Sequence, residues 1–168
     1  MAAERTRTYS WEDPFTVVNA AAGLPGLEVL QKIVAGELPP PPIAATLDFS
    51  LVEVERGKAV FEGEPAEFHY NPIGIVHAGL AATLLDSAMG CAFVSTAEAG
   101  TAWTTLELKA NFTRAMTIET GRVRCEGTVV HSGRRVATTE ARLEDASKRL
   151  LAHATSTILV LDARGPGR

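Results

Sequence analysis

The sequence predicts an α+β protein in which a six-stranded antiparallel sheet wraps around one long helix. Residues 78–94 are apolar nearly all round, which is typical of a buried helix. Several shorter segments on either side alternate apolar and polar residues with period two, as half-buried strands do. The chain of 168 residues, 46% of them hydrophobic, suits one domain and is too short for two.

Residues 1–42 are predicted to form an N-terminal extension. Residues 1–13 show no periodicity, and we expect them to be frayed. Glycine and proline interrupt the pattern that follows, so a single short helix is predicted from Gly26 to Ala35. The proline run 39–42 predicts a stiff extended spacer that leads into the sheet.

The main domain is predicted to span residues 43–162, with two strands before the helix. Residues 43–51 alternate apolar and polar side chains, which indicates a first strand. The phase slips between Val52 and Val54, as it does at a β-bulge. A second strand is predicted from Lys58 to Glu64.

Four more strands are predicted after the helix. We expect them to follow one another as a meander, and residues 163–168 to form a disordered tail. One helix followed by an antiparallel sheet favours a sheet that wraps the helix. The predicted strands cover residues 101–112, 120–131, 137–144 and 150–161.

Asp86 is the one carboxylate in the predicted central helix, where the other polar residues are Thr83 and Ser87. We expect Asp86 to be buried. A buried carboxylate without a partner is costly and its pKa is raised, which suits a general base or nucleophile near neutral pH. The alternative is that Asp86 caps a neighbouring loop.

The loop before this helix is rich in residues that permit sharp turns. Asn71, Pro72 and Gly74 allow the chain to turn tightly and to approach a ligand closely. At the helix start, near Ala78 and Gly79, free N–H groups form an electropositive end. Such an end is suited to stabilising a developing oxyanion.

The loop and helix together carry a recognisable motif. The sequence reads N-x-x-G-x-x-H-A-G from Asn71 to Gly79, and Asp86 lies nine residues after His77. This resembles the hotdog-fold acyl-CoA thioesterases of the phenylacetic-acid-degradation type, which are similar to 4-hydroxybenzoyl-CoA thioesterase. Their motif is N-x-x-G-x-x-H-G-G followed by an Asp at the same spacing.

The resemblance extends over roughly Ile43 to Leu161 and implies a hotdog fold that hydrolyses coenzyme A thioesters. Ala78 stands where the family usually has the first glycine of its motif. The donor in that family is a backbone N–H, which alanine also provides. The substitution should therefore narrow the pocket by a methyl group and keep the chemistry.

Three further residues take roles from the resemblance. Thr105 is expected to help hold the attacking water, although it lies on the strand face opposite Leu106 and Leu108. It would reach the site through strand twist or a partner subunit, and otherwise it is a threonine of ordinary β-propensity. His77 could be an acid, a base or a structural brace. Asn71 could orient substrate or water, or simply form an Asx turn.

The turn at residues 131–135 is a candidate site for the phosphates of coenzyme A. Arg134 and Arg135 place two guanidinium groups beside Gly133, with His131 next to them. Guanidinium groups bind phosphate bidentately, and in similar thioesterases this turn lies near the nucleotide. Without the resemblance, the arginine pair would be solvated surface charge.

Composition excludes several other classes. A net charge of −4 gives no basic face for nucleic acid. No signal peptide or membrane-spanning segment is evident, so a cytoplasmic protein is expected. Cys91 and Cys125 are read as small core residues. No phosphate-binding glycine-rich loop, metal-ligand cluster or serine nucleophile motif occurs, so we expect neither cofactor nor metal.

The predicted function is hydrolysis of an acyl-CoA by a homo-oligomer. Ala78 and Asp86 are eight residues apart in one helix, which separates their backbones by about 12 Å. A two-fold dimer, or a dimer of dimers, would bring these groups from different subunits together. The alternatives are a non-catalytic acyl-CoA-binding module and a hotdog dehydratase, although the His-Phe-Pro type motif of the latter is missing.

Overall fold

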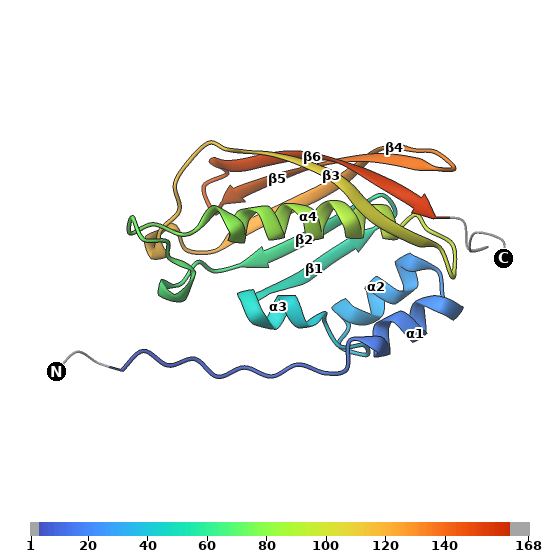
Figure 1. The fold of residues 1–168 in the computed structure, drawn as a ribbon, viewed down its shortest axis with the longest axis horizontal. Helices are drawn as coiled ribbons and strands as arrows, with labels where there is room; N and C mark the ends of the chain where they lie inside the picture. The colour runs from blue at the N-terminus through green and yellow to red at the C-terminus, as the bar shows by residue number, and fades with distance from the viewer. Residues whose placement is uncertain (1–3, 162–168) are drawn as a thin grey trace.

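Helix α4 (Ala78–Val94) is the element around which the sheet curves (Figure 1). The computed structural model describes residues 4–161, so the predicted tail at 163–168 lies outside the described residues. The six-stranded antiparallel sheet has the order β1-β2-β4-β5-β6-β3. Its strands are β1 (Phe49–Glu55), β2 (Lys58–Gly63), β3 (Ala102–Phe112), β4 (Val123–Ser132), β5 (Val136–Asp145) and β6 (Leu150–Leu161). The predicted fold class is confirmed.

The predicted four-strand meander is wrong at its first member. β4, β5 and β6 do form a meander, but β3 pairs with β6 at the edge of the sheet. β4 instead pairs with β2, with Lys58 opposite Thr128. The segment between β3 and β4, including the 3₁₀ turn η2 (Ile118–Thr120), crosses from one side to the other. Alternation identifies the faces of a strand but not its neighbours, which is why the error arose.

The core lies between α4 and the concave face of the sheet. Leu84, Leu85 and Met89 are fully buried there. Burial of each such side chain contributes roughly 1.5–3 kcal/mol. Gly127 on β4 allows the closest approach, because a Cβ at this position would overlap the backbone carbonyl of Ala88. The buried side of α4 is therefore fixed closely against the middle of the sheet.

The chain enters the sheet through a helix and not through a strand. Residues Pro42–Leu47 form α3, so the first strand starts at Phe49 and not at residue 43. Pro42 occupies the first turn of α3, where its fixed φ favours a helix and its missing N–H costs nothing. Asp48 ends the helix in the left-handed region with φ 56°. The predicted bulge is confirmed by a register shift between Leu51 and Glu53.

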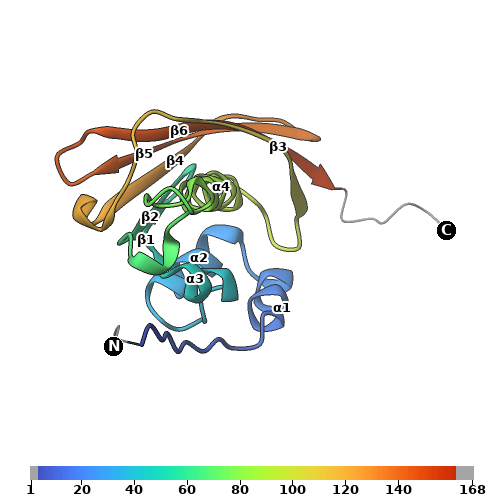
Figure 2. The same cartoon turned by 60° about the vertical axis from the view of Figure 1, so that its left-hand side comes forward.

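Two helices precede α3, whereas the sequence predicted one. α2 (Gly26–Val34) matches that prediction, and α1 (Phe15–Gly23) was missed. α1 buries none of its residues, so its sequence carries no core-facing stripe. Gly26 lies so close to Val94 that a side chain there would overlap the Val94 carbonyl. Figure 2 shows these helices below α4, with β3, β5 and β6 above it and β1 and β2 beside it.

The N-terminal arm, residues 4–13, runs past α3 to reach α1 (Figure 1). Arg7 anchors it by donating from Nη1 to the Thr46 carbonyl at 2.6 Å and from Nη2 to the Ala45 carbonyl at 2.7 Å. Arg5 pairs with Glu67 at 2.6 Å. The expectation that this stretch is frayed is therefore wrong for the described part of it.

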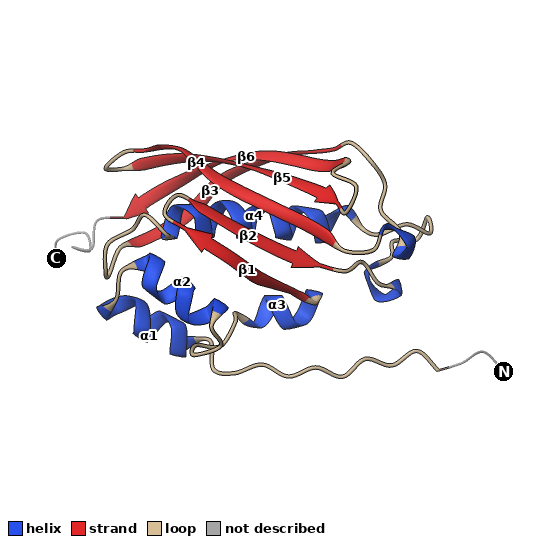
Figure 3. Ribbon diagram, turned by 180° about the vertical axis from the view of Figure 1, so that it is seen from behind, coloured by secondary structure: helices blue, strands red, loops and turns tan. Residues whose placement is uncertain are grey.

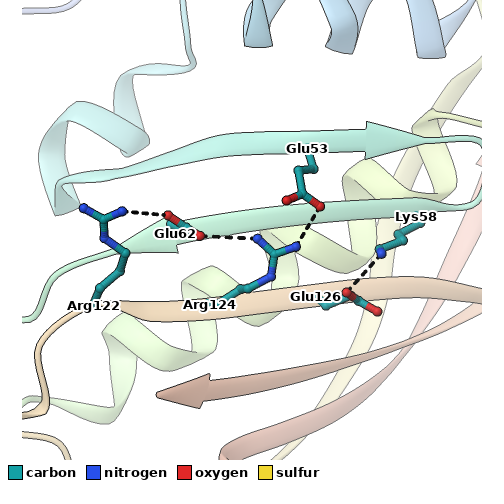
Figure 4. Close-up of polar contacts among 6 residues, drawn as sticks. All are labelled: Glu53, Lys58, Glu62, Arg122, Arg124 and Glu126. Atoms are coloured by element: carbon teal, nitrogen blue, oxygen red, sulfur yellow. Dashed lines mark hydrogen bonds and ion pairs between the residues drawn. The ribbon is translucent and has the colours of Figure 1, made fainter. Parts of the chain in front are cut away.

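The convex face of β1, β2 and β4, visible from behind in Figure 3, carries charged side chains that pair with each other. Arg124 donates to Glu53 at 2.7 Å and to Glu62 at 3.3 Å (Figure 4). Lys58 pairs with Glu126 at 3.2 Å on the same face. The Arg124 guanidinium lowers the pKa of Glu53. This face is therefore solvated and internally neutralised.

Candidate active site

The loop before α4 is held by the side chain of Asn71. Its Oδ1 accepts from the backbone N–H of Ile73 at 3.0 Å and of Ile75 at 3.3 Å. Gly74 completes the turn with φ 80°, a value that glycine adopts without strain. Asn71 thus forms the Asx turn that was the simpler of its two predicted roles, and its amide nitrogen is not used by these contacts.

His77 is the N-cap of α4. Its backbone is extended, and its Nδ1 accepts from the Gly79 N–H at 2.8 Å. A Cβ on residue 79 would lie 2.8 Å from this Nδ1, so glycine at 79 makes room for the cap. Because Nδ1 accepts, the ring proton sits on Nε2, which faces outward from an exposed residue. The geometry supports the brace among the roles predicted for His77.

The backbone N–H of Ala78 is the open donor at the helix start. Within residues 4–161 it donates to no protein acceptor, whereas the next N–H is used by His77. Ala78 and Asn71 line the same cavity of about 220 Å³, together with Arg114 and Phe112. Two of the predicted site residues are therefore brought together here.

Asp86 lies on a face of α4 that the sheet leaves open, so the prediction of a buried carboxylate is wrong for the single chain. Asp86 is exposed, and Ala82, Thr83 and Ser87 beside it are partly exposed. Small and apolar side chains occur on all sides of α4, so its sequence does not reveal which side the sheet covers. Exposure in one chain leaves this face free for a partner.

Thr105 donates its hydroxyl proton to Asp86 Oδ1 at 3.1 Å. The expectation that it faces away from Leu108 is wrong, because a register shift between Thr105 and Glu107 displaces Leu106 from the alternation. Leu106 is 57% exposed, and Thr105 and Leu108 share the face toward α4. The bulge thus aims the threonine hydroxyl at the carboxylate.

The turn carrying His131, Gly133, Arg134 and Arg135 lies at the other end of the sheet from Ala78 (Figure 1). Near it, Val129 donates to the Gly57 carbonyl, and Gly57 donates to Ser95 just beyond the end of α4. Within the described chain neither guanidinium pairs with a carboxylate. One chain does not bring this turn to the helix start.

A second cavity of about 530 Å³ flanks the helix start on the side of α3. His69 lies buried in its wall and is 6% exposed. Its Nδ1 accepts from the Ala66 N–H, and its Nε2 contacts the Leu47 carbonyl, each at 2.9 Å. Burial lowers the pKa of His69. Arg7 also lines this cavity, and it was missed because it lies in a stretch without periodicity.

Four large apolar residues, Met89, Phe93, Trp103 and Phe112, lie in two different environments. Met89 and Phe93 are core, and the Phe93 ring packs against Trp103 at 5.9 Å between centroids. Phe112 is half exposed and lines the smaller cavity beside Ala78. Of this set, Phe112 is therefore the one placed beside the proposed reaction centre.

Cys125 is buried in the core, and Cys91 is partly buried and packs against the core. Burial raises the pKa of Cys91 to about 12, with a smaller contribution from the Asp86 carboxylate, and burial also raises the pKa of Cys125. Neither thiol is a thiolate near neutral pH, so neither is a candidate nucleophile. Across residues 4–161, no cluster of three or more His, Cys, Asp or Glu side chains is placed to hold a metal ion. No helix in that range has the length and apolar character needed to cross a membrane.

Comparison with known proteins decides the family. The sequence model of the thioesterase superfamily matches residues 73–152, which contain α4 and most of the loop before it. A conserved protein from Pseudomonas aeruginosa of known structure is 31% identical, is covered over 93% of its length by 71% of this chain, and gives a TM-score of 0.66. The chain belongs to the thioesterase superfamily. It is therefore a thioester hydrolase with the hotdog fold.

Two other relatives of this thioesterase carry more specific names. A 1,4-dihydroxy-2-naphthoyl-CoA hydrolase from Listeria monocytogenes is 28% identical over 119 residues, which are 71% of this chain and 95% of the relative. A phenylacetic acid degradation-related protein from Ralstonia eutropha JMP134 gives a TM-score of 0.70 at 27% identity and is covered over 98% of its length by 78% of this chain. The resemblance found from the motif is confirmed.

Proposed function

We propose that this thioesterase hydrolyses acyl-CoA at sites shared between the two subunits of a homodimer. The name of the Listeria relative, a hydrolase of a coenzyme A thioester, supports coenzyme A as the thiol component. The family fixes the bond that is cleaved, and the arrangement of residues around α4 supports the roles given below.

Asp86 supplies the nucleophilic step, either by activating a water molecule or by attacking the thioester carbonyl itself. The Thr105 hydroxyl, 3.1 Å from its carboxylate, orients the carboxylate and holds the water. The Ala78 N–H donates a hydrogen bond to the carbonyl oxygen and stabilises the negative charge that develops there. Asn71, whose amide nitrogen is free of the Asx turn, positions the substrate beside it.

The separation of these groups is the observation that carries the proposal. Ala78 and Asp86 are eight residues apart in α4, so their backbones are separated by about 12 Å, and no aspartate side chain spans that distance to one carbonyl. One chain therefore holds two incomplete half-sites. A two-fold axis places the helix start of one subunit beside Asp86 of the other and completes two equivalent sites.

The free edge of the sheet supports the same assembly. β3 is an edge strand of 11 residues, and Leu106 and Phe112 on it are 57% and 50% exposed. Long, partly apolar edges invite pairing with another strand. Pairing β3 with its counterpart joins the two sheets and lays the open faces of the two α4 helices together. A dimer of dimers is an extension of this arrangement.

The arginine turn acquires a role in this dimer. It lies beyond the C-terminal end of α4, and antiparallel α4 helices bring that end toward the helix start of the partner subunit. Arg134 and Arg135 then hold the phosphates of coenzyme A, with His131 and Gly133 shaping the turn. This arrangement requires residues of both subunits for each substrate.

Complementation tests the shared site. Asn71→Ala and Asp86→Asn subunits, each inactive alone, are mixed by co-expression. In a mixed dimer with shared sites, one site carries both lesions and the other carries neither, so thiol release should return toward one working site per dimer. If both groups served one chain, every site would keep a lesion and the mixture would remain inactive.

Release of free thiol from a panel of acyl-CoAs tests the reaction itself. Hydration of the matching enoyl-CoAs is measured in parallel. Thiol release without hydration is the expected result. Hydration alone would assign a dehydratase, and tight binding without turnover of either kind would assign a non-catalytic acyl-CoA-binding module.

A further inference from the structure

The N-terminal arm forms part of the wall of a cavity to which the proposed reaction steps assign no role. This cavity of about 530 Å³ lies beside the helix start, on the opposite side from the smaller cavity shared by Asn71 and Ala78. Its size is within the range of small-molecule sites. Leu47, Phe68, Tyr70 and Leu80 supply apolar and aromatic surface to the lining.

The arm lies outside the segment that the family model matches. That segment is residues 73–152, and it also excludes helices α1 to α3 and strands β1 and β2. Arg7 is the residue through which the arm lines the cavity.

Arg7 is the charged group of the cavity wall, and its orientation is fixed from several sides. Its Nη1 and Nη2 donate to the last carbonyls of α3 at 2.6 and 2.7 Å. Its guanidinium lies 4.1 Å from the centre of the Phe68 ring and 4.8 Å from that of Tyr9. A guanidinium has more N–H donors than these two hydrogen bonds use, and cation–π contacts leave those donors free at its edge.

Arg7 is not neutralised by an ion pair within the part of the chain that the structure describes. By contrast, Arg5 on the same arm pairs with Glu67. The cavity lining contains neither Asp nor Glu. Arg7 is partly buried, where a charge is screened less than in bulk water. The cavity is therefore complementary to a ligand that is apolar along its length and anionic at one end.

We propose that this cavity receives the acyl group of the substrate and that Arg7 binds a carboxylate at its far end. The inference rests on the proposed acyl-CoA thioesterase activity and specifies its substrate class. With the thioester carbonyl at the Ala78 N–H, the acyl chain passes around the helix start to Gly79 and Thr83, which line the large cavity. Arg7 acts as a specificity residue and takes no part in the bond cleavage.

Matched pairs of substrates test this assignment. The kcat/KM values are measured for succinyl-CoA against butyryl-CoA, adipoyl-CoA against hexanoyl-CoA, and suberoyl-CoA against octanoyl-CoA. In the wild type, the ω-carboxyacyl member should be preferred about tenfold or more in at least one pair, because a charge-assisted hydrogen bond distinguishes the two. The chain length of the pair that shows this preference indicates the distance between the thioester at Ala78 and the guanidinium of Arg7.

Variants of the arm separate recognition from simple anchoring. Arg7→Met should abolish the preference, and Arg7→Lys, which keeps the charge, should retain part of it. Arg5→Met is the matched control, since Arg5 lies on the same arm but outside the lining, and it should leave the preference unchanged. If Arg7→Met lowers Tm but leaves the substrate ratio unchanged, Arg7 only holds the arm and the inference is overturned.

The assay also distinguishes failure of the inference from failure of the function. Hydrolysis of both members of every pair without preference for the carboxylate keeps the thioesterase and removes the inference. Absence of hydrolysis for all six substrates removes the proposed acyl-CoA activity for this class. In that case calorimetric titration of the wild type with hexanoate and with uncharged hexan-1-ol decides. Hexanoate binding that Arg7→Met abolishes sustains the cavity assignment, and binding equal to that of hexan-1-ol, or absent binding, ends it.

Discussion

The outer face of β1, β2 and β4 and the open face of α4 both present carboxylates to solvent. The two faces differ in the partners that these carboxylates have. On the sheet, Glu53, Glu62 and Glu126 each lie within 2.7–3.5 Å of a cationic nitrogen (Figure 4). On α4, Asp86 has a hydroxyl donor at 3.1 Å and no cation within the described chain. The first face is complete in one chain, and the second is not.

The difference separates stabilising charge from charge that is available for chemistry. Exposed ion pairs contribute little to stability but leave no group free to bind a ligand. Within the described residues Asp86 has no cationic partner, and the Ala78 N–H further along the same helix is an unused donor at a cavity, so both groups are available for chemistry. Exposure alone is therefore a poor guide to function here, and the state of each group's partners is a better one.

The largest effect is expected from removing the backbone donor. Ala78→Pro deletes the free N–H and should abolish thiol release, whereas Ala78→Gly should be tolerated. Proline fits the first helical turn, and the extended His77 before it, with ψ 134°, is compatible with a following proline. Thermal unfolding by circular dichroism checks that the fold survives. A folded and active proline variant would show that the oxyanion is bound elsewhere.

The next effect compares a carboxylate from each face. Asp86→Asn should lower kcat by about 100-fold or more with the fold intact, because a positioned base or nucleophile is lost. Glu62→Gln is the matched control on the sheet and should leave kcat unchanged. Steady-state kinetics of the two variants checks the contrast. Equal kinetic effects, or a fully active Asp86→Asn enzyme, would remove the functional distinction between the faces.

His69 offers a third case, a buried polar side chain whose two ring nitrogens both have hydrogen-bond partners. Burial lowers its pKa, so the unfolded chain binds the proton at a higher pH than the folded chain does. Stability should therefore fall as pH drops below about 6.5, the ordinary value for histidine, because protonated Nδ1 can no longer accept from the Ala66 N–H. The loss of this hydrogen bond should lower Tm by about 2–4 °C.

Melting curves between pH 8 and pH 5 measure this effect against a His69→Gln variant. The difference in Tm between wild type and variant should change across the interval, since only the wild type gains the proton at this position. Parallel curves would show that His69 contributes nothing to the pH dependence of folding.

The smallest effect is expected on the ion-paired face. Arg124→Met removes contacts with Glu53 and Glu62 and should lower Tm by about 2 °C or less, a difference that shrinks further in high salt. Activity should be unchanged. Loss of turnover in this variant would mean that the sheet face takes part in function and that the two surfaces are not distinct.

Sequence periodicity predicted α4 to its correct ends and located most of the strands. It failed where one pattern fits two structures. Residues 43–47 alternate as a strand does, but proline in the first turn and the end of the segment at Asp48 favour helix α3. It also failed at Leu106, because one bulged residue reverses every following side chain.

The motif alone predicts Asn71, His77, Ala78 and Asp86 as site residues, since their spacing is a local property of the sequence. The open face of α4 could not be predicted, because the side chains of that helix are small on all sides and the strands that cover it are distant in sequence. Arg7 was equally hidden. It contacts residues about 40 positions further along the chain, and nothing in the pattern of its own segment indicates that contact.

The pairing of β3 with β6 has a consequence for the order in which this chain matures. Ala102 lies opposite Leu161 and Phe112 opposite Ala152, so the strand that carries Thr105 finds its neighbour only when the last strand is available. Contacts between segments this far apart in sequence form slowly, because a long loop must close first. During synthesis, β3 therefore has no strand to pair with until β6 has been made. The proposed contact between Thr105 and Asp86 therefore depends on β6, the one strand that holds β3 in the described sheet.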